Sequence, residues 1–430
     1  MSNDKLKIGR EIYKLCEELW PITRSITGDG VRETLKIINR HLQDLVVNEI
    51  PTGTQCFDWD VPLEWNIRSA YIINPNGEKI IDFKNNNLHV VGYSTPINTT
   101  MSLKELQNNL FSLRDQPDAI PYVTSYYKKN WGFCISENQR KLLIEGDYKV
   151  YIDSELKNGS LTYGELIIPG KSKKEVFLST YICHPSMANN ELSGPVLSSA
   201  LIKYIKEKFN NPKYTYRFVF VPETIGSITY LNQHLDNLQK NVICGFNLSC
   251  VGDNRSYSHI ESRMGNTLAD KALQSALIDL DNVVKYSFLE RGSDERQYCA
   301  PGVDLPLCGF CRTKYGEYEE YHTSADNFDV VTADGLDGAF DVMRNIINSF
   351  EVNLFPKINV KCEPQLGRRG LRNNVSRKGY VEDLSLRSNF IAYADGKHSL
   401  FDIAIKIKKN IKLVIIEAKK LEKHGLLHKV

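Results

Sequence analysis

The sequence predicts an α/β protein with a layered, mostly parallel sheet, and two patterns lead to this prediction. From about residue 130 to 355, apolar runs with strand character alternate with stretches of helical periodicity. Such alternation is typical of helices that cover a layered sheet. The runs at 175–183 and 216–221 are almost continuously apolar, as expected of strands that are buried on both faces.

The N-terminal residues predict two helices. Apolar side chains recur at helical spacing over residues 5–20, and Pro21 ends this pattern. A second helical pattern begins at Val31, after a turn that contains glycine. We assign residues 1–43 and 131–358 to one α/β domain.

The segment from 44 to 130 differs from its surroundings, because short strand-like runs replace the helical periodicity. The sequence Asn-Pro-Asn-Gly at 74–77 has strong turn chemistry for a hairpin between two of these runs. We therefore expect residues 44–130 to form a β-rich subdomain inserted into the α/β domain. Its expected strands are 45–50, 67–73, 79–83 and 88–93.

In the α/β domain, helical patterns follow the apolar runs. Ligands of such sheets collect at the carboxyl ends of the strands, so functional residues are expected directly after each run. The expected strands are 175–183, 216–221, 242–251 and 305–310, and the expected helices are 193–209, 227–238 and 267–280.

Residues 361–430 form a separate, basic segment. They contain 16 Lys and Arg against 7 Asp and Glu, whereas the preceding 360 residues contain 38 against 45. Helical patterns at 399–407 and 413–421 suit a helix-turn-helix module, and lysines around their junction could contact phosphates. Such modules also dock proteins, so a protein and DNA are both candidate partners.

Composition excludes several classes of protein. Charged residues make up 25% and hydrophobic residues 42%, so the chain is not disordered throughout. Mean hydropathy is −0.34, and no apolar run approaches the roughly 18 residues of a membrane helix, so we expect no membrane segment. The N-terminus lacks an export signal and the ten cysteines are scattered, which predicts a cytoplasmic protein with reduced thiols.

Residues that suit a metal site follow the predicted strands. His184 follows the first buried strand, Glu223 follows the second, and His322 lies in a later loop. Two histidines and a carboxylate at such positions suit a zinc site that keeps one position open for water. Zinc would polarise a carbonyl group, and Glu223 would move the proton.

Several motifs together resemble the M28-type zinc aminopeptidases. A closer resemblance, to aminopeptidase-like proteins found with bacterial polysaccharide biosynthesis genes, depends on the stretches 20–28 and 364–371. It covers nearly the whole chain, and it implies a sheet of zinc-exopeptidase type and a C-terminal winged-helix domain at 361–430. The motifs shared with the wider family are His184, 188–194, Pro222-Glu223, 247–249, Ser293-Asp294 and Tyr321-His322-Thr323.

This resemblance implies roles for single residues. His184 matches the first metal histidine and His322 the last, while Glu223 matches either the general base or a ligand. Asn190 stands where the family has a metal-bridging Asp, and Ser249 where it has a later Asp ligand. Because two carboxylates are replaced, we expect one zinc ion, held by the two histidines and Glu223 with Asn190 as a further ligand.

Other candidates are weighed against plainer explanations. Glu191 and Asp253 are additional candidate ligands. Cys308 and Cys311 form an isolated Cys-x-x-Cys in an apolar run, for which buried structural thiols are expected rather than a zinc or redox site.

Three residues near the predicted cleft are candidates for substrate binding: Arg291, Asp294 and Tyr321. Arg291 could anchor a substrate carboxylate, because guanidinium groups bind carboxylates in a two-pronged geometry. For Arg24 and Arg32, ordinary ion pairs are expected instead.

The sequence thus predicts a zinc-dependent hydrolase, of aminopeptidase or amidohydrolase type, for a small amide-containing or peptide substrate. The departures at Asn190 and Ser249 support an alternative, a binding protein in polysaccharide biosynthesis that has lost catalysis. That protein would dock a partner or DNA through its C-terminal module. A homo-oligomer is a candidate assembly in either case.

Overall fold

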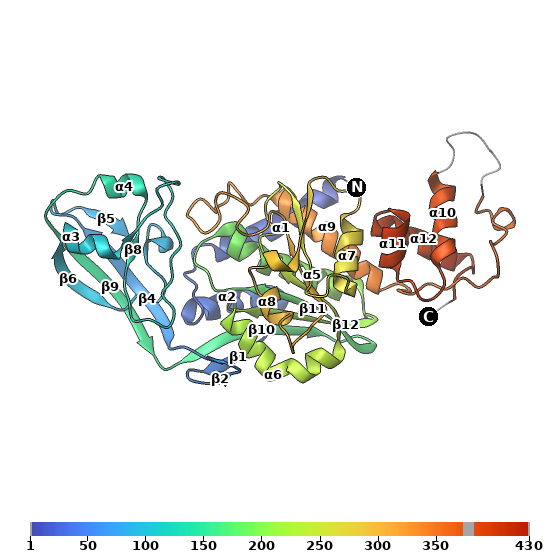
Figure 1. Cartoon of the computed structure of the whole chain (residues 1–430), viewed down its shortest axis with the longest axis horizontal. Helices are drawn as coiled ribbons and strands as arrows, with labels where there is room; N and C mark the ends of the chain where they lie inside the picture. The colour runs from blue at the N-terminus through green and yellow to red at the C-terminus, as the bar shows by residue number, and fades with distance from the viewer. Residues whose placement is uncertain (1, 373–381, 429–430) are drawn as a thin grey trace.

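A computed structural model describes residues 2–372 and 382–428 of the 430-residue chain. These residues form three parts in a row, with an α/β domain between a β-rich subdomain and a helical module (Figure 1). Among them, no helix combines the length and the apolar composition that crossing a membrane requires.

An eight-stranded sheet forms the centre of the α/β domain, with strand order β1-β10-β12-β11-β13-β16-β14-β15. The central strands β12, β11, β13 and β16 run parallel, as predicted, whereas β1, β10 and β14 join the sheet by antiparallel pairing. The strands are β1 Val46–Pro51, β10 Ser160–Ile168, β11 Ser172–Tyr181, β12 Tyr214–Val221, β13 Val242–Leu248, β14 Tyr257–Ile260, β15 Val283–Tyr286 and β16 Leu307–Cys311.

Helices cover both faces of this sheet (Figure 1). Successive side chains of a strand point to opposite faces, so Tyr216, Phe218 and Phe220 of β12 pack with one set of helices. Val219 and Val221 pack with α6 on the other face. The helices are α1 Ser2–Leu19, α2 Asp29–Leu42, α5 Ser193–Lys208, α6 Ile225–Asn241, α7 Leu268–Leu277, α8 Glu295–Tyr298 and α9 Ala333–Phe350.

Two strands join a different sheet from the one that the sequence division implied. β1 was assigned to the inserted subdomain, but it pairs with β10 in the large sheet. β9 was assigned to the α/β domain, but it pairs with β4 and β6 in a four-stranded sheet of order β5-β4-β9-β6. Strand patterns give the type of an element and do not name its partner, which explains both differences. The two short paired strands β2 Gln55–Cys56 and β3 Trp59–Asp60 follow β1, and β2 contacts α6 of the α/β domain (Figure 1). The subdomain elements are β4 Glu64–Ile73, β5 Lys79–Asp82, β6 Ile97–Ser102, α3 Leu103–Leu106, β7 Leu110–Phe111, β8 Phe133–Cys134, α4 Glu137–Lys141 and β9 Asp147–Lys157.

The segment 88–93 was predicted as a strand, and this prediction is wrong. It begins with a 3₁₀ turn, Asn87–His89, whose first residues are capped by Asn86: the Asn86 side chain accepts from the Leu88 N–H. The rest of the segment makes isolated bridges to other loops. Its apolar side chains are buried all the same, which is why its pattern looked like that of a strand.

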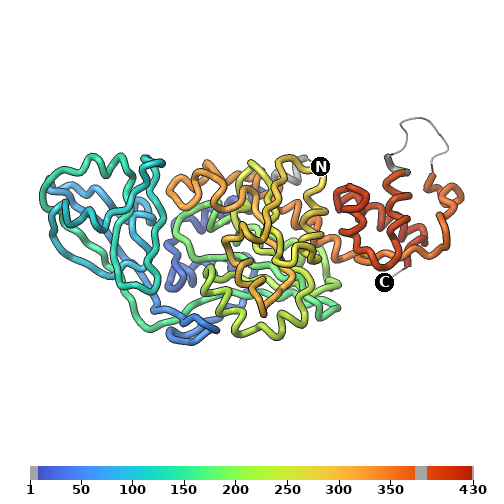
Figure 2. Tube along the Cα trace, viewed as in Figure 1, coloured from blue at the N-terminus to red at the C-terminus, as the bar shows by residue number. Residues whose placement is uncertain are grey.

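The C-terminal helices form a module that is attached to α7 and α9, at the end of the molecule away from the β-rich subdomain (Figure 2). Asn410 donates from Nδ2 to the carbonyl groups of Ala276 and Ile278, at 2.9 and 2.7 Å, where α7 ends. Lys271 of α7 pairs with Asp402 of the module at 2.9 Å. The helices are α10 Glu382–Tyr393, α11 Leu400–Ile407 and α12 Ile411–Lys423.

Replacing Asn410 with Ala should loosen this attachment by about 1–3 kcal/mol, because two carbonyl groups lose their donor. Faster amide hydrogen exchange in residues 400–428 and a lower urea midpoint are the expected measurements. Lys412→Ala, at an exposed neighbouring position, is the matched control and should change neither. Unaltered amide hydrogen exchange in the Asn410 variant would contradict the role of Asn410 in attaching the module to α7.

Candidate metal and substrate site

Three of the predicted metal-site residues lie together. His184 follows β11 and Glu223 follows β12, and these two strands run parallel side by side. His184 Nε2 lies 3.7 Å from Glu223 Oε2. His322, in the loop between β16 and α9, lies beside them, with its ring centroid 5.5 Å from that of His184. The three side chains therefore face one another in one small region.

A π-helical turn, Ala188–Leu192, brings Asn190 to the same part of the fold. Gly194 permits the close approach of α5 to the sheet, because a Cβ there would lie 2.2 Å from Thr180 Oγ1. Asn190 is buried, and its Nδ2 donates to the Tyr181 hydroxyl at 2.9 Å. Its Oδ1 has no hydrogen-bond partner among the described residues. A buried oxygen of this kind suits a water molecule or a cation as partner.

A buried ion pair positions His184. Glu191 Oε2 accepts from the backbone N–H groups of Cys183 and His184, at 3.2 and 2.9 Å, and lies 3.2 Å from His184 Nδ1. Glu191 Oε1 lies 3.1 Å from Arg24 Nε, which also donates to the His184 carbonyl at 2.9 Å. Burial raises the pKa of Glu191 to about 8, while Arg24 and the two amides favour its charged form.

This arrangement sets the orientation of the His184 ring. The contact with Glu191 favours a proton on Nδ1, which leaves the Nε2 lone pair facing Glu223. Burial, and to a lesser extent Arg24, lowers the pKa of His184 to about 3, so the ring is neutral. Metal-binding histidines commonly donate their other ring N–H to a carboxylate in this way.

His322 is the second neutral imidazole. Its carbonyl accepts from the Tyr122 N–H at 2.9 Å, and its ring stacks on Tyr321 with centroids 3.9 Å apart. Its Nε2 is shielded from solvent and lacks a hydrogen-bond partner within the described part of the chain. Burial and His184 lower the pKa of His322 to about 3. In the tautomer with its proton on Nδ1, this shielded nitrogen is a suitable cation ligand.

Glu223 presents one free oxygen. Its Oε1 accepts from the Ser293 hydroxyl at 2.8 Å, and its Oε2 faces His184. Burial and the nearby Asp294 raise the pKa of Glu223 to about 8. Asp294 accepts from the Thr224 N–H at 2.8 Å, so it anchors the turn that follows Glu223.

Three non-glycine residues of the α/β domain near this region have positive φ angles, which strain the backbone. Thr224, Cys250 and His322 have φ angles of 65°, 50° and 57°. Each costs about 1–3 kcal/mol, and such residues gather at functional sites where the surrounding structure holds them. Thr224 is β-branched, for which this conformation is especially unfavourable.

A pocket of about 380 Å³ adjoins these residues and is shared by two parts of the molecule. His184, Glu223 and His322 line it from the α/β domain. The Tyr122 ring, from the inserted subdomain, lies 5.2 Å from the His184 ring and 5.1 Å from the His322 ring. The aromatic residues that line it are Trp59, Tyr122, Tyr126 and Tyr127.

The predicted substrate-binding residues have different environments. Tyr321 stacks on His322, and Asp294 supports the Glu223 turn. Arg291 donates to the Phe288 carbonyl at 3.0 Å and lies over the Phe288 ring, and it is not among the pocket-lining residues. Arg296 does line the pocket, although the sequence offered no reason to prefer it to Arg291.

Several other candidates are used elsewhere in the fold. Asp253 accepts from the N–H and hydroxyl of Thr313, at 2.8 and 2.7 Å. The Ser249 hydroxyl contacts Cys311 Sγ at 3.7 Å. The ion pairs expected for Arg24 and Arg32 are confirmed, with Glu191 and Glu64 as the acids.

In the part of the chain that the structure describes, two sets of possible ligand atoms lie within 4.8 Å of one another. The predicted set of His184, Glu223 and His322 is spaced more widely than these, so a cation there would draw its ligands closer or bind water as well. The sets are Cys183, His184 and Glu191, and His259, Asp270 and Cys308.

The second of these sets has a structural role. Asp270 caps α7 by accepting from the N–H and hydroxyl of Thr267, at 2.8 and 2.7 Å, and it also bonds Ser262 and His259. Both oxygens of the Asp270 carboxylate therefore already accept hydrogen bonds within the fold.

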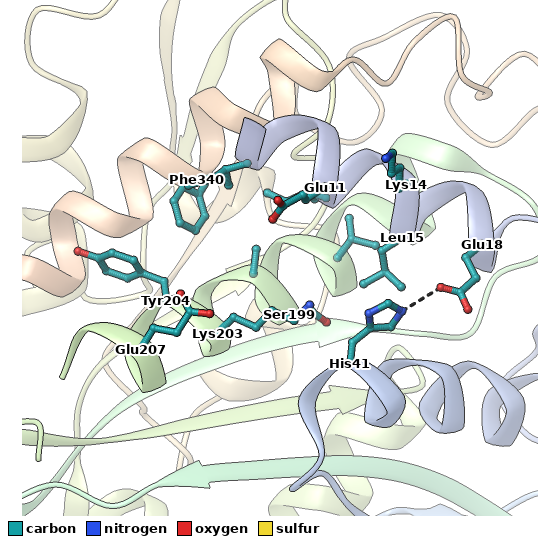
Figure 3. A pocket seen from close by; sticks show the side chains of 14 residues that line it. Glu11, Lys14, Leu15, Glu18, His41, Ser199, Lys203, Tyr204, Glu207 and Phe340 are labelled. Carbon is teal, nitrogen blue, oxygen red and sulfur yellow. Dashed lines mark hydrogen bonds and ion pairs between the residues drawn. The ribbon is translucent and has the colours of Figure 1, made fainter. Parts of the chain in front are cut away.

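Another cavity, of about 360 Å³, lies between α1, α2, α5 and α9 (Figure 3). Its walls are mainly apolar, and His41 pairs with Glu18 beside it at 2.9 Å. Its lining residues include none of the predicted site residues. The functional argument therefore concerns the pocket beside His184.

Comparison with known proteins gives the family. Residues 13–353 match the domain of unknown function DUF4910, and residues 354–429 match the winged helix-turn-helix domain. A relative from Clostridium acetobutylicum, named as a candidate polysaccharide biosynthesis protein with an aminopeptidase-like domain, is 45% identical over 401 residues, which are 93% of this chain and 91% of the relative. The chain belongs to the DUF4910 family and ends in a winged-helix domain.

Solved structures confirm the fold. A candidate peptidase from Clostridium acetobutylicum has a TM-score of 0.91 at 42% identity, covering 100% of this chain and 98% of that chain. A zinc aminopeptidase from Bacillus subtilis has a TM-score of 0.58 at 14% identity, and the match covers 79% of this chain and 93% of that chain. An M28 peptidase precursor from Shewanella amazonensis has a TM-score of 0.54 at 14% identity, and the match covers 85% of this chain and 99% of that chain. The predicted M28 aminopeptidase-like architecture is therefore confirmed.

Replacing Glu191 with Gln should destabilise the protein by about 3–5 kcal/mol, because Arg24 would keep a buried charge without a counterion. Urea denaturation measures this loss. The control is the double variant with Arg24→Met and Glu191→Gln, which removes both charges and should recover a large part of the stability. A loss below about 1 kcal/mol in the single variant would show that the pair is not buried as described.

Proposed function

We propose that this protein is a zinc-dependent hydrolase, of aminopeptidase or amidohydrolase type, for a small amide-containing or peptide substrate. The observation that carries the proposal is the meeting of His184, His322 and Glu223 in one pocket at the carboxyl ends of parallel strands. The fold adds support, because similar solved structures include a zinc aminopeptidase.

The chemistry of the available atoms fits one zinc ion. His184 and His322 each offer a neutral Nε2, and Glu223 offers a carboxylate oxygen. The His322 Nε2 and the Asn190 Oδ1 are buried without partners among the described residues, as expected of atoms whose ligand is a cation or water. Since Glu223 is the one carboxylic acid among these four residues, we propose one ion rather than two.

In the proposed reaction, bound zinc would polarise the substrate carbonyl and make a water molecule easier to deprotonate. In this reaction Glu223 acts as the base and the two histidines hold the ion: Glu223 Oε2 accepts the proton of the attacking water, because Oε1 already accepts from the Ser293 hydroxyl. The same oxygen then delivers the proton to the leaving amine. Tyr122 and its neighbours from the subdomain shield this exchange from bulk water.

Replacing Glu223 with Gln should lower hydrolysis of aminoacyl-p-nitroanilides and N-acyl amides by at least about 100-fold, the usual loss for a missing general base. Zinc content, measured by mass spectrometry, then separates two roles: retained zinc assigns proton transfer, and lost zinc assigns a ligand. Glu145→Gln, at an exposed position in the subdomain, should change neither activity nor zinc content. Full activity in the Glu223 variant would refute the proposal.

A second candidate function is recognition without hydrolysis. Asn190 and Ser249 stand at two positions where the M28 pattern has carboxylates, and Ser249 contacts Cys311 instead. A binding protein of this kind would hold a peptide or sugar in the same pocket. Zinc below about half an equivalent after purification without chelators, together with no hydrolysis, would favour this function.

For the winged-helix domain we propose a protein partner rather than DNA. Helix-turn-helix proteins insert the N-terminal end of their second helix into the major groove, and here that end of α12 is bonded to α7 through Asn410. Leu413 and Ile416 are exposed on the same helix, as is common in protein-binding surfaces. A gel-shift assay with mixed duplex DNA at low salt should show no retardation, and clear retardation would contradict this proposal.

A further inference from the structure

Arg296 supplies a guanidinium group to the lining of the pocket. It is exposed, lines the pocket from α8, and donates from Nη2 to the Thr224 hydroxyl at 2.6 Å. No ion pair within the described ranges 2–372 and 382–428 includes it. A guanidinium group has five N–H donors in a planar fork, so most of them remain available to a ligand.

An exposed aromatic pair lines the same pocket. Trp59 and Tyr127 are 40% and 53% exposed, and their ring centroids are 6.0 Å apart in an edge-to-face arrangement. The Tyr127 hydroxyl donates to the Asp60 carbonyl at 3.1 Å, which fixes that ring. Because both rings are partly exposed and also line the pocket, they lie at its rim and offer apolar faces to a ligand.

Arg296 brings a guanidinium group to a pocket lining in which Glu223 is the acidic residue. A ligand carboxylate at Arg296 would gain two charge-assisted hydrogen bonds in the bidentate geometry of this pair. A lysine would offer a point charge without that geometry.

We propose that the pocket recognises a small carboxylate that carries a ring, with Arg296 binding the carboxylate and Trp59 and Tyr127 packing against the ring. The proposal rests on the proposed function in one respect, the placement of the reacting amide beside Glu223. Recognition itself needs neither zinc nor hydrolysis. Two sources share this chemistry, an N-acylated aromatic amino acid and a uronic acid.

The test uses two pairs of probes, each of which differs only at the carboxylate. One pair is N-acetyl-L-phenylalanine and its amide, and the other is D-glucuronate and D-glucose. Isothermal titration should show the acid binding at least about tenfold more tightly than its neutral counterpart in one pair, and that pair identifies the source.

Three variants and one control variant assign this preference to residues. Arg296→Gln should remove the preference for the acid, and Arg296→Lys should restore part of it because the charge returns. Trp59→Leu should weaken the binding of both probes of a pair by similar factors, since both probes make the ring contact. Arg291→Gln, five residues before Arg296 in the sequence and outside the pocket lining, should keep the preference.

Titrations of zinc-free protein in EDTA and of zinc-loaded protein separate this proposal from the hydrolase proposal. A preference for the acid that persists without zinc and without turnover supports recognition even if the hydrolase proposal fails. Equal binding within both pairs, no binding of any probe up to about 10 mM, or an unchanged preference in Arg296→Gln would each overturn it.

Discussion

The ion pair between Arg24 and Glu191 connects the candidate site to the rest of the protein. Glu191 holds the main chain and the ring of His184, and Arg24 holds both Glu191 and the His184 carbonyl. Arg24 comes from the segment between α1 and α2, and it also donates to the Leu19 carbonyl at 2.8 Å. Two charges removed from water are costly unless hydrogen bonds satisfy them. The geometry of the histidine therefore depends on a segment about 160 residues away in the sequence.

The same segment links the site to the inserted subdomain. The Thr27 hydroxyl accepts from the Trp65 N–H at 3.0 Å and contacts the Tyr93 hydroxyl at 2.6 Å. On the other side of the pocket, Ile120 and Ser324 exchange two hydrogen bonds of 2.9 Å. The subdomain is therefore joined to the α/β domain at two places around the pocket, and it supplies the aromatic walls that the sheet itself lacks.

The sequence predicted the architecture well, because buried strands, helical periodicity and turn residues are local patterns. It also placed His184 and Glu223 at the ends of strands, which follows from the order of apolar runs. The choice between Arg291 and Arg296 could not be made in this way, since it depends on how one short helix turns. The contribution of Tyr122 depends on a loop with no periodic pattern, and the role of Glu191 depends on a contact with a distant arginine.

The winged-helix domain matches a different family from the rest of the chain, yet its interior continues that of the α/β domain. The Phe401 ring lies 5.5 Å from the Phe350 ring of α9, and Leu400, Ile411 and Val414 belong to the same buried cluster as helices α1, α5, α7 and α9. A fragment cut near residue 354, where the match to one family ends and the match to the other begins, would expose apolar helix surfaces to water. Expression of the residues before this boundary alone would then yield aggregates, so biochemical work on this protein requires the intact chain.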